Sequence, residues 1–175
     1  LRFEECKIPV ANRIGEAGQG FKAAMAAFDI FRPSVGAAGV GLARRALNET
    51  LAHTEQRRLF GKPMHGLEGV QMALADMATD LEGAALLVYR AAWAHDVRGE
   101  RGAYEACMAK LAGSEAAGRI VDRAVQLLGG KGVTRGHIIE QLYREARPMR
   151  IYEGASEIQK LVIARNLIKS HAQLG

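Results

Sequence analysis

Apolar residues recur at helical spacing over long stretches of this chain, and this periodicity constrains its fold more than any other feature. Three such stretches cover residues 33–56, residues 74–95 and a third segment that ends at Leu127. No strand-like alternation of apolar and polar residues occurs after about residue 10. A helix of about 25 residues is roughly 38 Å long, at 1.5 Å per residue. Long amphipathic helices with short connections predict an all-α, up-and-down bundle of the four-helix type.

Shorter helices are expected beside the three long ones. A helix of about ten residues is predicted around residues 21–28, from the spacing of its aromatic and Met residues. We expect a new helix to begin near Pro33, because proline is tolerated in the first helical turn. Two further short helices are predicted over residues 139–147 and 157–169, which would flank the bundle.

The first residues have a different pattern. Residues 3–10 predict an extended strand, and a Gly-rich segment at residues 14–20 follows it. A lone strand is not stable in water. We therefore expect residues 1–15 to be an extended N-terminal tail, either the end of a preceding β-domain or a linker. Residues 16–175 would then form the bundle, and we expect the chain to be one part of a longer protein.

The composition narrows the class of protein. A chain of 175 residues is long enough for one hydrophobic core, and no apolar stretch approaches the ~20 residues of a membrane helix, so no membrane insertion is predicted. Cys6 and Cys107 lie far apart, and the five histidines have no metal-ligand spacing. We expect neither a disulfide framework nor a metal site. A reducing compartment fits best: the cytoplasm or, in a eukaryote, the mitochondrial matrix.

The net charge of +5 leaves two interpretations open. It could reflect an anionic partner such as a nucleotide cofactor. The basic residues are scattered rather than clustered, however, which is equally consistent with an ordinary solvated surface. We predict no nucleic-acid partner.

The segment at residues 144–159 contains the strongest candidate for a functional side chain. Pro148 tends to stop a helix at or before its neighbour, and Ser156 with Gln159 three residues later has the pattern of a capping box. Glu153 is therefore expected in a short loop between two helices, near the positive N-terminus of the second. From these residues alone, a solvated surface glutamate is the simpler interpretation.

A glycine-rich turn has both a structural and a functional interpretation. Gly129, Gly130 and Gly132 end a long helix, as glycine C-caps do. Lys131 is followed by glycine, not by the Ser or Thr of a Walker phosphate loop, and the glycines close a helix instead of opening one. A bare glycine also lets a ligand approach the backbone, so cap and contact are compatible.

Two sets of charged residues have equally simple structural interpretations. Arg57 lies near a predicted helix C-terminus, where a positive charge is favourable against the helix dipole. Asp29 and Arg32 are three residues apart and could form an ordinary ion pair on a helix surface.

The segment at residues 151–159, IYEGASEIQ, closely resembles the most diagnostic motif of the acyl-CoA dehydrogenase family. Five other segments resemble landmarks of that family, in its order and near its spacing. They are FDIFR at 28–32, QRRLFGK at 56–62, LADM at 74–77, QLLGGKG at 126–132 and YREAR at 143–147. The resemblance covers essentially the whole chain and implies the C-terminal helical domain of a short- or medium-chain-like member.

The resemblance implies FAD-dependent α,β-dehydrogenation of an acyl-CoA thioester. Glu153 would be the base that takes the α-proton, and the flavin would accept the β-hydride. Branches such as isovaleryl-CoA dehydrogenase carry the base immediately before the counterpart of Arg32, but here that position is Phe31, which cannot accept a proton. The residues implied to contact the acyl-CoA substrate are Asp29, Arg32, Tyr152 and Gly154.

The resemblance also implies cofactor contacts, some of them with a flavin held by a neighbouring subunit. The implied FAD-binding residues are Arg57, Phe60, Gln126, Gly129, Gly130, Ser156 and Glu157. Arg57 would pair with the flavin pyrophosphate, which its fork of donors suits, whereas Lys131 is variable in the family. Glu68 departs from the family, which commonly has a glutamine there near the flavin; a carboxylate would repel the cofactor phosphates.

Partners follow from the same resemblance. Family members are usually homodimers or homotetramers built through this bundle, and an acceptor of the electron-transfer-flavoprotein type is implied. Related acyl-CoA oxidases and flavin monooxygenase-like proteins share the bundle and remain alternatives, as does a bundle that acts only in oligomer assembly. Because the family's flavin-binding sheet domain lies outside these residues, we expect the chain alone to be catalytically inactive.

Overall fold

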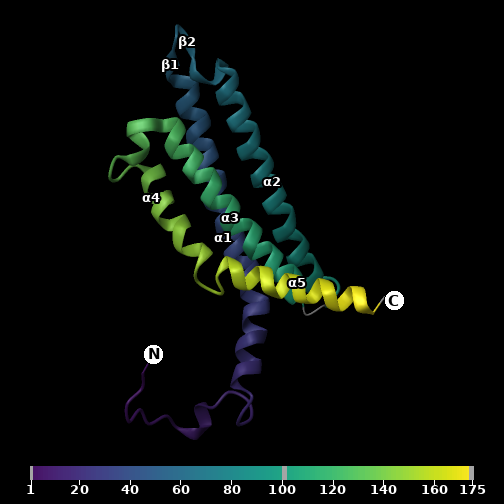
Figure 1. The fold of residues 1–175 in the computed structure, drawn as a ribbon. Coiled ribbons are helices and arrows are strands. Elements are labelled where there is room, and N and C mark those ends of the chain that lie inside the picture. The colour runs from purple at the N-terminus through teal and green to yellow at the C-terminus, as the bar shows by residue number, and fades with distance from the viewer. Residues whose placement is uncertain (1, 100–101, 174–175) are drawn as a thin grey trace.

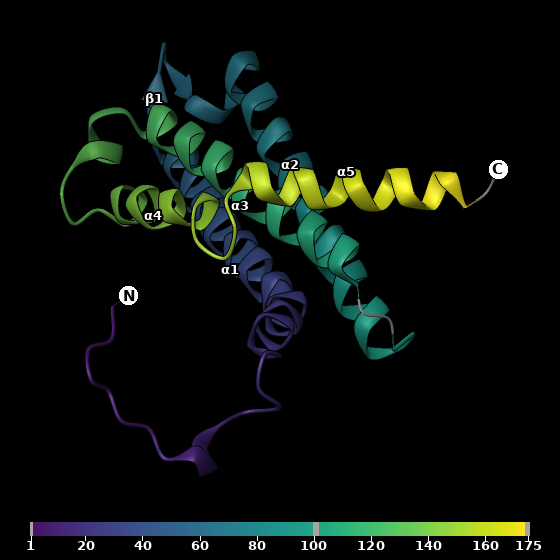
Figure 2. The same ribbon diagram turned by 60° about the horizontal axis from the view of Figure 1, so that its bottom comes forward.

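Three long helices form the body of the fold. In the computed structural model, which describes residues 2–99 and 102–173, α1 (Gly20–Gln56), α2 (Glu68–Asp96) and α3 (Ala103–Leu128) lie side by side (Figure 1). The short α4 (Ile138–Ala146) packs against α3 and α1, and α5 (Ser156–Ala172) crosses α3 (Figure 2). The predicted all-α bundle with short flanking helices is confirmed.

Short elements connect the helices. Single 3-10 turns occupy Val10–Asn12 (η1), Met64–Gly66 (η2), Gly129–Val133 (η3) and Arg147–Arg150 (η4). Between α1 and η2, β1 (Arg58–Leu59) pairs antiparallel with β2 (Lys62–Pro63). Phe60 and Gly61 connect the two strands with φ angles of 51° and 80°. Positive φ at both loop residues is typical of a two-residue hairpin turn, which the sequence analysis did not predict.

The core lies where α1, α2, α3 and α4 meet. It consists largely of Ala with a few larger apolar side chains, among them Leu47 from α1, Met77 and Leu81 from α2, Ile120 from α3 and Ile139 from α4. Each is buried, and α3 contributes to the core along much of its length. The burial of this apolar surface is the main term that stabilises the bundle.

Glycines bring α1 and α3 into close contact. A Cβ atom on Gly36 would lie 2.5 Å from the Ala109 carbonyl oxygen, and one on Gly39 would lie 2.5 Å from that of Gly113. Both distances are shorter than van der Waals contact, so a larger residue would force the helices apart. The close approach of these two backbones therefore explains the glycines at positions 36 and 39.

The helix break predicted near Pro33 is wrong. Helix α1 runs without interruption from Gly20 to Gln56, with Pro33 in its interior. A proline inside a helix costs about 3 kcal/mol because it removes a backbone donor and crowds the preceding turn. The buried neighbours Arg32, Val35 and Gly36 pack against the bundle on either side of it, and we infer that this packing outweighs the local cost.

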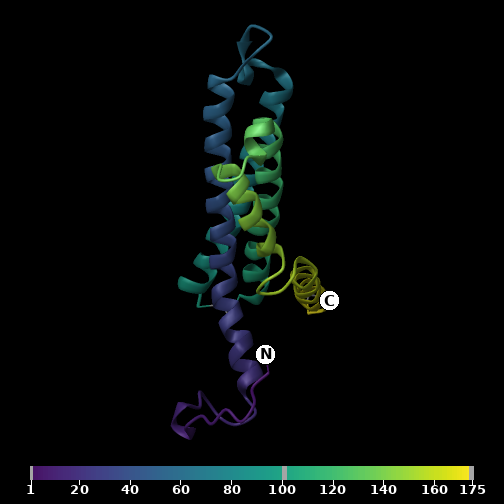
Figure 3. The same cartoon turned by 90° about the vertical axis from the view of Figure 1, so that its left-hand side faces the viewer.

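The strand predicted at residues 3–10 is also wrong. The described part of the tail, residues 2–19, contains only the turn η1 and is exposed throughout. It extends away from the bundle (Figure 3), and none of the described residues pairs with it in a β-ladder. Whether a β-domain precedes it stays a prediction. Among the described helices, none is long and apolar enough to cross a membrane.

Candidate active site

Glu153 lies in the short loop between η4 and α5, where the sequence predicted it. Its φ angle is 53° and that of Gly154 is 93°, so two consecutive residues have left-handed backbone. For a residue with a side chain this conformation costs roughly 1–2 kcal/mol. It persists only where the surrounding structure holds it.

Side chains from three helices hold this turn. Gln159 of α5 donates its side-chain amide to the carbonyl oxygens of Glu153 and Gly154, both at 3.0 Å. Lys110 Nζ, from α3, donates to the Gly154 carbonyl oxygen at 2.9 Å, and Arg32 Nε, from α1, donates to that of Glu153 at 3.4 Å. A Cβ atom on Gly154 would lie 2.5 Å from Gln159 Nε2, so the turn requires glycine there.

Asp29 and Arg32 form the ion pair that their spacing allows. Arg32 Nη1 lies 3.7 Å from Asp29 Oδ1, and its guanidinium carbon is 5.1 Å from the centroid of the Phe28 ring. Arg32 Nη1 also donates to Cys107 Sγ at 3.5 Å. Burial raises the pKa of the Cys107 thiol, which stays neutral beside the guanidinium. Arg32 is 7% exposed, so contacts with both α1 and α3 fix its position.

The Glu153 carboxylate has one oxygen without a hydrogen-bond partner among the described residues. Its Oε2 atom is buried, and no hydrogen-bond donor of the described residues reaches it. A general base must lie within hydrogen-bond reach of the proton that it accepts, and this oxygen makes Glu153 a candidate for that role. Burial and the negative charge of Glu153 raise the pKa of the neighbouring Tyr152 phenol, which therefore stays protonated. The structure thus brings together Asp29, Arg32, Glu153 and Gly154. Tyr152 directly precedes Glu153 in the sequence.

The capping box predicted at residues 156–159 is wrong. Ala155 is the N-cap of α5, no side chain caps this end, and Ser156 is the first helical residue. Ser156 Oγ instead donates at 2.6 Å to Glu115 Oε1, which also accepts from Arg150 Nε at 2.8 Å. Burial opposes ionisation of Glu115, but the two donors outweigh it and lower the pKa. Glu115 of α3 thus anchors both ends of the loop.

A second group of predicted residues meets at the far end of α1. Arg57, Gly129 and Gly130 line one hollow of about 560 Å³, together with His53 and Lys131. Burial lowers the pKa of His53, and the positive charges of Lys131 and Arg57 lower it further. The described residues that line the hollow include no acid, so it favours anions. The sequence analysis missed His53, because only the fold brings it to the glycine turn.

The other predicted cofactor residues lie outside that hollow. Phe60 is 91% exposed at the hairpin tip, and Gln126 is exposed near the end of α3. Glu157 is exposed in the first turn of α5, next to the buried Ser156. Glu68 is the first residue of α2, where a carboxylate is favourable against the helix dipole. That role explains an acid at this position without any cofactor.

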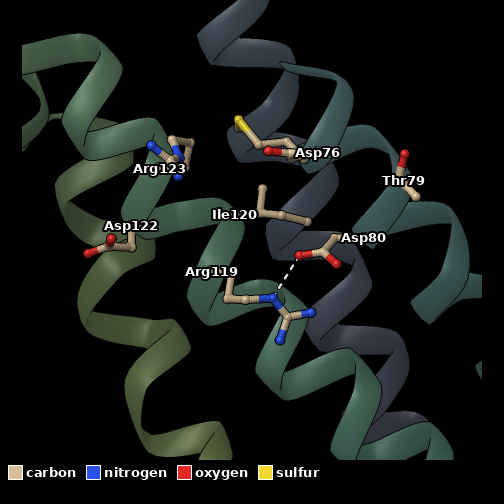
Figure 4. A pocket seen from close by; sticks show the side chains of 8 residues that line it. Asp76, Thr79, Asp80, Arg119, Ile120, Asp122 and Arg123 are labelled. Atoms are coloured by element: carbon tan, nitrogen blue, oxygen red, sulfur yellow. Dashed lines mark hydrogen bonds and ion pairs between the residues drawn. The ribbon is translucent and has the colours of Figure 1, made fainter. Parts of the chain in front are cut away.

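A third hollow, of about 450 Å³, lies between α2 and α3 (Figure 4). It contains charged residues of both signs, and Arg119 Nε donates to Asp80 Oδ2 across it at 2.7 Å. None of the predicted site residues is among the described residues that line it. We interpret it as a polar contact between two helices. In the described part of the chain, no group of three or more His, Cys, Asp or Glu could hold a metal ion.

The two predicted groups of site residues are well separated. From Arg32 in α1 to its C-cap Arg57 the chain advances by 25 helical residues, roughly 38 Å along the axis. The hollow at the far end of α1, called the far hollow below, fits a phosphate-bearing cofactor. Its residues supply cations and a glycine turn, and a Cβ atom on Gly129 or Gly130 would meet nothing within 4 Å. The Glu153 loop offers a proton acceptor instead.

Comparisons with known proteins agree with these observations. The chain is 47% identical, over 171 residues, to the mitochondrial short-chain specific acyl-CoA dehydrogenase of Sus scrofa, with 98% of this chain and 41% of that protein covered. It superposes on butyryl-CoA dehydrogenase from Megasphaera elsdenii with a TM-score of 0.90 and 36% identity, covering 95% of this chain and 43% of that one. A structure of PigA with FAD and proline gives a TM-score of 0.90 and 32% identity, covering 94% and 43%.

These relatives are longer than the chain, which spans about two fifths of the length of the curated relatives it matches. Residues 18–168 match the family described as acyl-CoA dehydrogenase, C-terminal domain. That match includes the Glu153 loop, the buried Arg32 and the glycine turn after α3. The chain therefore belongs to the acyl-CoA dehydrogenase family and corresponds to its C-terminal domain.

Proposed function

We propose that this chain is the C-terminal helical domain of an FAD-dependent acyl-CoA dehydrogenase that oxidises an acyl-CoA thioester between its α- and β-carbons. One observation carries the proposal. The left-handed turn at Glu153 is held by contacts with Arg32, Lys110 and Gln159, and one oxygen of its carboxylate has no hydrogen-bond donor among the described residues. The likeness to a short-chain acyl-CoA dehydrogenase supports this reaction.

In this mechanism Glu153 takes the α-proton of the substrate. Bound FAD supplies the acceptor for the hydride that leaves the β-carbon. The backbone N–H of Glu153 would hold the thioester carbonyl oxygen and so stabilise the charge that develops there as the proton leaves. Because the Glu153 and Gly154 carbonyls are both hydrogen-bonded, the base is oriented before the substrate binds, which lowers the entropic cost of the reaction.

The substrate would lie along the surface formed by the loop and the first half of α1. Asp29 and Arg32 would lie near the CoA portion, and Tyr152 and Gly154 would line the acyl site. Phe31, immediately before Arg32, cannot serve as an alternative base. This supports a short- or medium-chain-like branch, as does the likeness to short-chain and butyryl-CoA dehydrogenases.

The far hollow would bind FAD held by a second copy of the protein. Its distance from the Glu153 loop is too long for one dinucleotide to span, so we assign Arg57, Gly129 and Gly130 to a neighbouring copy's cofactor. Phe60 and Gln126 lie at the same end of the bundle and would join them. Ser156 and Glu157 would lie near the flavin at the Glu153 loop. The arrangement requires at least a homodimer.

The natural electron acceptor is a separate part of the proposal. We assign an acceptor of the electron-transfer-flavoprotein type, in the cytoplasm or the mitochondrial matrix. An acyl-CoA oxidase or a flavin monooxygenase-like protein would instead pass electrons to oxygen. Oxygen consumption by the holoenzyme during acyl-CoA turnover separates these cases: stoichiometric consumption supports an oxygen-using relative, and its absence supports a dehydrogenase.

Exposed apolar side chains on α5 support a role in assembly. Helix α5 exposes large apolar side chains along its length: Ile158, Leu161, Leu167 and Ile168. Such a surface is typical of an interface between copies. Sedimentation of the chain tests this: a dimer or tetramer supports the assembly role, and a strict monomer contradicts it.

The base is tested by anaerobic addition of a short acyl-CoA to the holoenzyme that contains this chain. We expect the flavin absorbance to bleach in the unchanged protein and in Glu145→Gln, because Glu145 is an exposed residue of α4. Glu153→Gln should bind FAD equally but fail to bleach. A Glu153→Gln protein that bleaches at the unchanged rate would overturn the proposal.

A further inference from the structure

Lys110 occupies an unusual place for a lysine. It lies about two turns into α3 and is 0% exposed. A buried ammonium group loses its hydration, which costs several kcal/mol unless nearby acceptors and charges compensate. A lysine fully enclosed in a helical bundle therefore needs a compensating contact.

That contact is the Glu153 loop. Lys110 Nζ donates to the Gly154 carbonyl oxygen at 2.9 Å, across 44 residues of sequence. Burial lowers the pKa of Lys110, and the negative charge of Glu153 is the largest influence that opposes this lowering. Lys110 is thus linked to the loop by a hydrogen bond to the backbone and by attraction to the carboxylate.

The hydrogen bond acts on the strained part of the loop. Glu153 and Gly154 both have positive φ, and a left-handed residue with a side chain reverts to ordinary backbone unless it is held. Gln159 donates to the same Gly154 oxygen from the helix that follows the loop. Lys110 instead anchors the turn to α3, the central helix of the bundle. The position of the carboxylate therefore depends on the core as well as on α5.

We propose that Lys110 is a positioning residue, which holds the Glu153–Gly154 turn so that the Glu153 carboxylate meets the α-carbon of the substrate. This inference rests on the proposed role of Glu153 as the base. Lys110 transfers no proton and contacts no substrate. Its effect is on geometry, and a displacement of about 1 Å at a reacting group lowers rates by about a hundredfold.

The test uses Lys110→Met in the holoenzyme, which keeps the length of the side chain and removes its donor and charge. We expect flavin reduction by a saturating acyl-CoA to slow by about a hundredfold, with FAD content and substrate affinity little changed. The decisive readout is the pair of isotope effects on flavin reduction. The effect of α-deuteration should rise and that of β-deuteration should fall, because α-proton removal becomes more rate-limiting.

The matched control is Lys169→Met, the same change at an exposed position in the last turn of α5. It should leave rate and isotope effects unchanged. If Lys110→Met does not fold with FAD, Lys110→Arg decides the question. Arginine keeps the charge but places its donors differently, so we expect a folded protein with a raised α-deuterium effect.

The outcomes separate the two proposals. Lys110 variants that lose rate only in proportion to lost FAD, with unchanged isotope effects, would show a merely structural role and overturn the inference. Unchanged rates would overturn it as well. Glu153→Gln is measured in parallel. If this variant reduces flavin normally, the proposed base is wrong. If it is inactive while the Lys110 variants are normal, only the positioning role is refuted.

Discussion

Arg32 and Glu153 are separated by 121 residues of sequence, yet the guanidinium Nε of Arg32 lies 3.4 Å from the Glu153 carbonyl oxygen. The contact joins the first helix of the bundle to the loop before the last one. Arg32 is itself fixed by Asp29 and Cys107. The geometry at the proposed base thus depends on how α1 and α3 pack, and changes in that packing have predictable effects.

Replacement of Gly154 should separate loop geometry from general stability. In Gly154→Ala the new Cβ would lie 2.5 Å from Gln159 Nε2, at a φ of 93°. Gly136→Ala is the matched control, because its φ is 88° and nothing lies within 4 Å of its Cβ. We expect both to lose roughly 1–2 kcal/mol of stability from the backbone conformation. Only Gly154→Ala should slow anaerobic flavin reduction; equal rates for both variants would contradict this account.

Two glycines of α1 should respond in opposite directions to the same substitution. Gly39→Ala places a Cβ 2.5 Å from the Gly113 carbonyl oxygen, and we expect it to lower the free energy of unfolding by about 1–3 kcal/mol. Gly41→Ala adds a Cβ with nothing within 4 Å, and it should raise that free energy by roughly 0.5–1 kcal/mol through helix propensity. Urea unfolding of both variants checks the prediction, which fails if the two changes have the same sign.

Glu115 should make the stability of the chain depend on pH. Burial opposes its ionisation, but the donors Ser156 and Arg150 lower its pKa below the value of an unfolded glutamate. The stabilising contribution is complete above that unfolded value and is lost as the pH falls through the lower, folded one. We expect Glu115→Gln to be less stable than the unchanged chain at pH 7 and to lose less stability on acidification. Urea midpoints at several pH values test this, with the exposed Glu82→Gln as control.

The pKa of His53 should change when an anion binds in the hollow beside it. Burial and the charges of Lys131, Arg57 and His137 lower its pKa. A bound pyrophosphate offsets those charges, so ADP or FAD should raise the pKa of His53, and binding should tighten as the pH falls through it. NMR titration of the imidazole signals with and without ADP measures this. Exposed His171 in α5 should not respond, and an equal response from both histidines would refute a specific site.

The sequence predicted most of the fold because long amphipathic helices are encoded locally. The ends of α2 at Asp96 and of α3 at Leu128 each lie within one residue of the predicted ends, whereas α2 begins at Glu68, six residues before the predicted stretch. Pro33 shows the limit of local rules: its intrinsic preference indicated a helix start, and tertiary packing overrode it. The strand predicted at residues 3–10 is wrong because a strand needs a partner, and none of the described residues pairs with this segment.

The candidate site was predicted from motifs, and its supporting contacts were not. Glu153, Arg32 and Asp29 could be singled out by resemblance and spacing. Lys110 and Glu115 could not, because a charged residue in the middle of a helix usually faces solvent and only the fold reveals its burial. The supposed capping box at Ser156 failed for the same reason: Ser156 lies inside the helix instead of at its cap, and its hydroxyl donates to the Glu115 carboxylate across the bundle.

The central claim, that Glu153 takes the α-proton, is tested most directly by exchange of that proton with deuterated solvent. The substrate is an acyl-CoA analogue that cannot lose a β-hydride, incubated with the oxidised holoenzyme in D2O. We predict that the unchanged protein and Glu145→Gln incorporate deuterium at the α-carbon, and that Glu153→Gln with a full complement of FAD does not. Exchange at the unchanged rate in Glu153→Gln would contradict the account, because another group would then be the base.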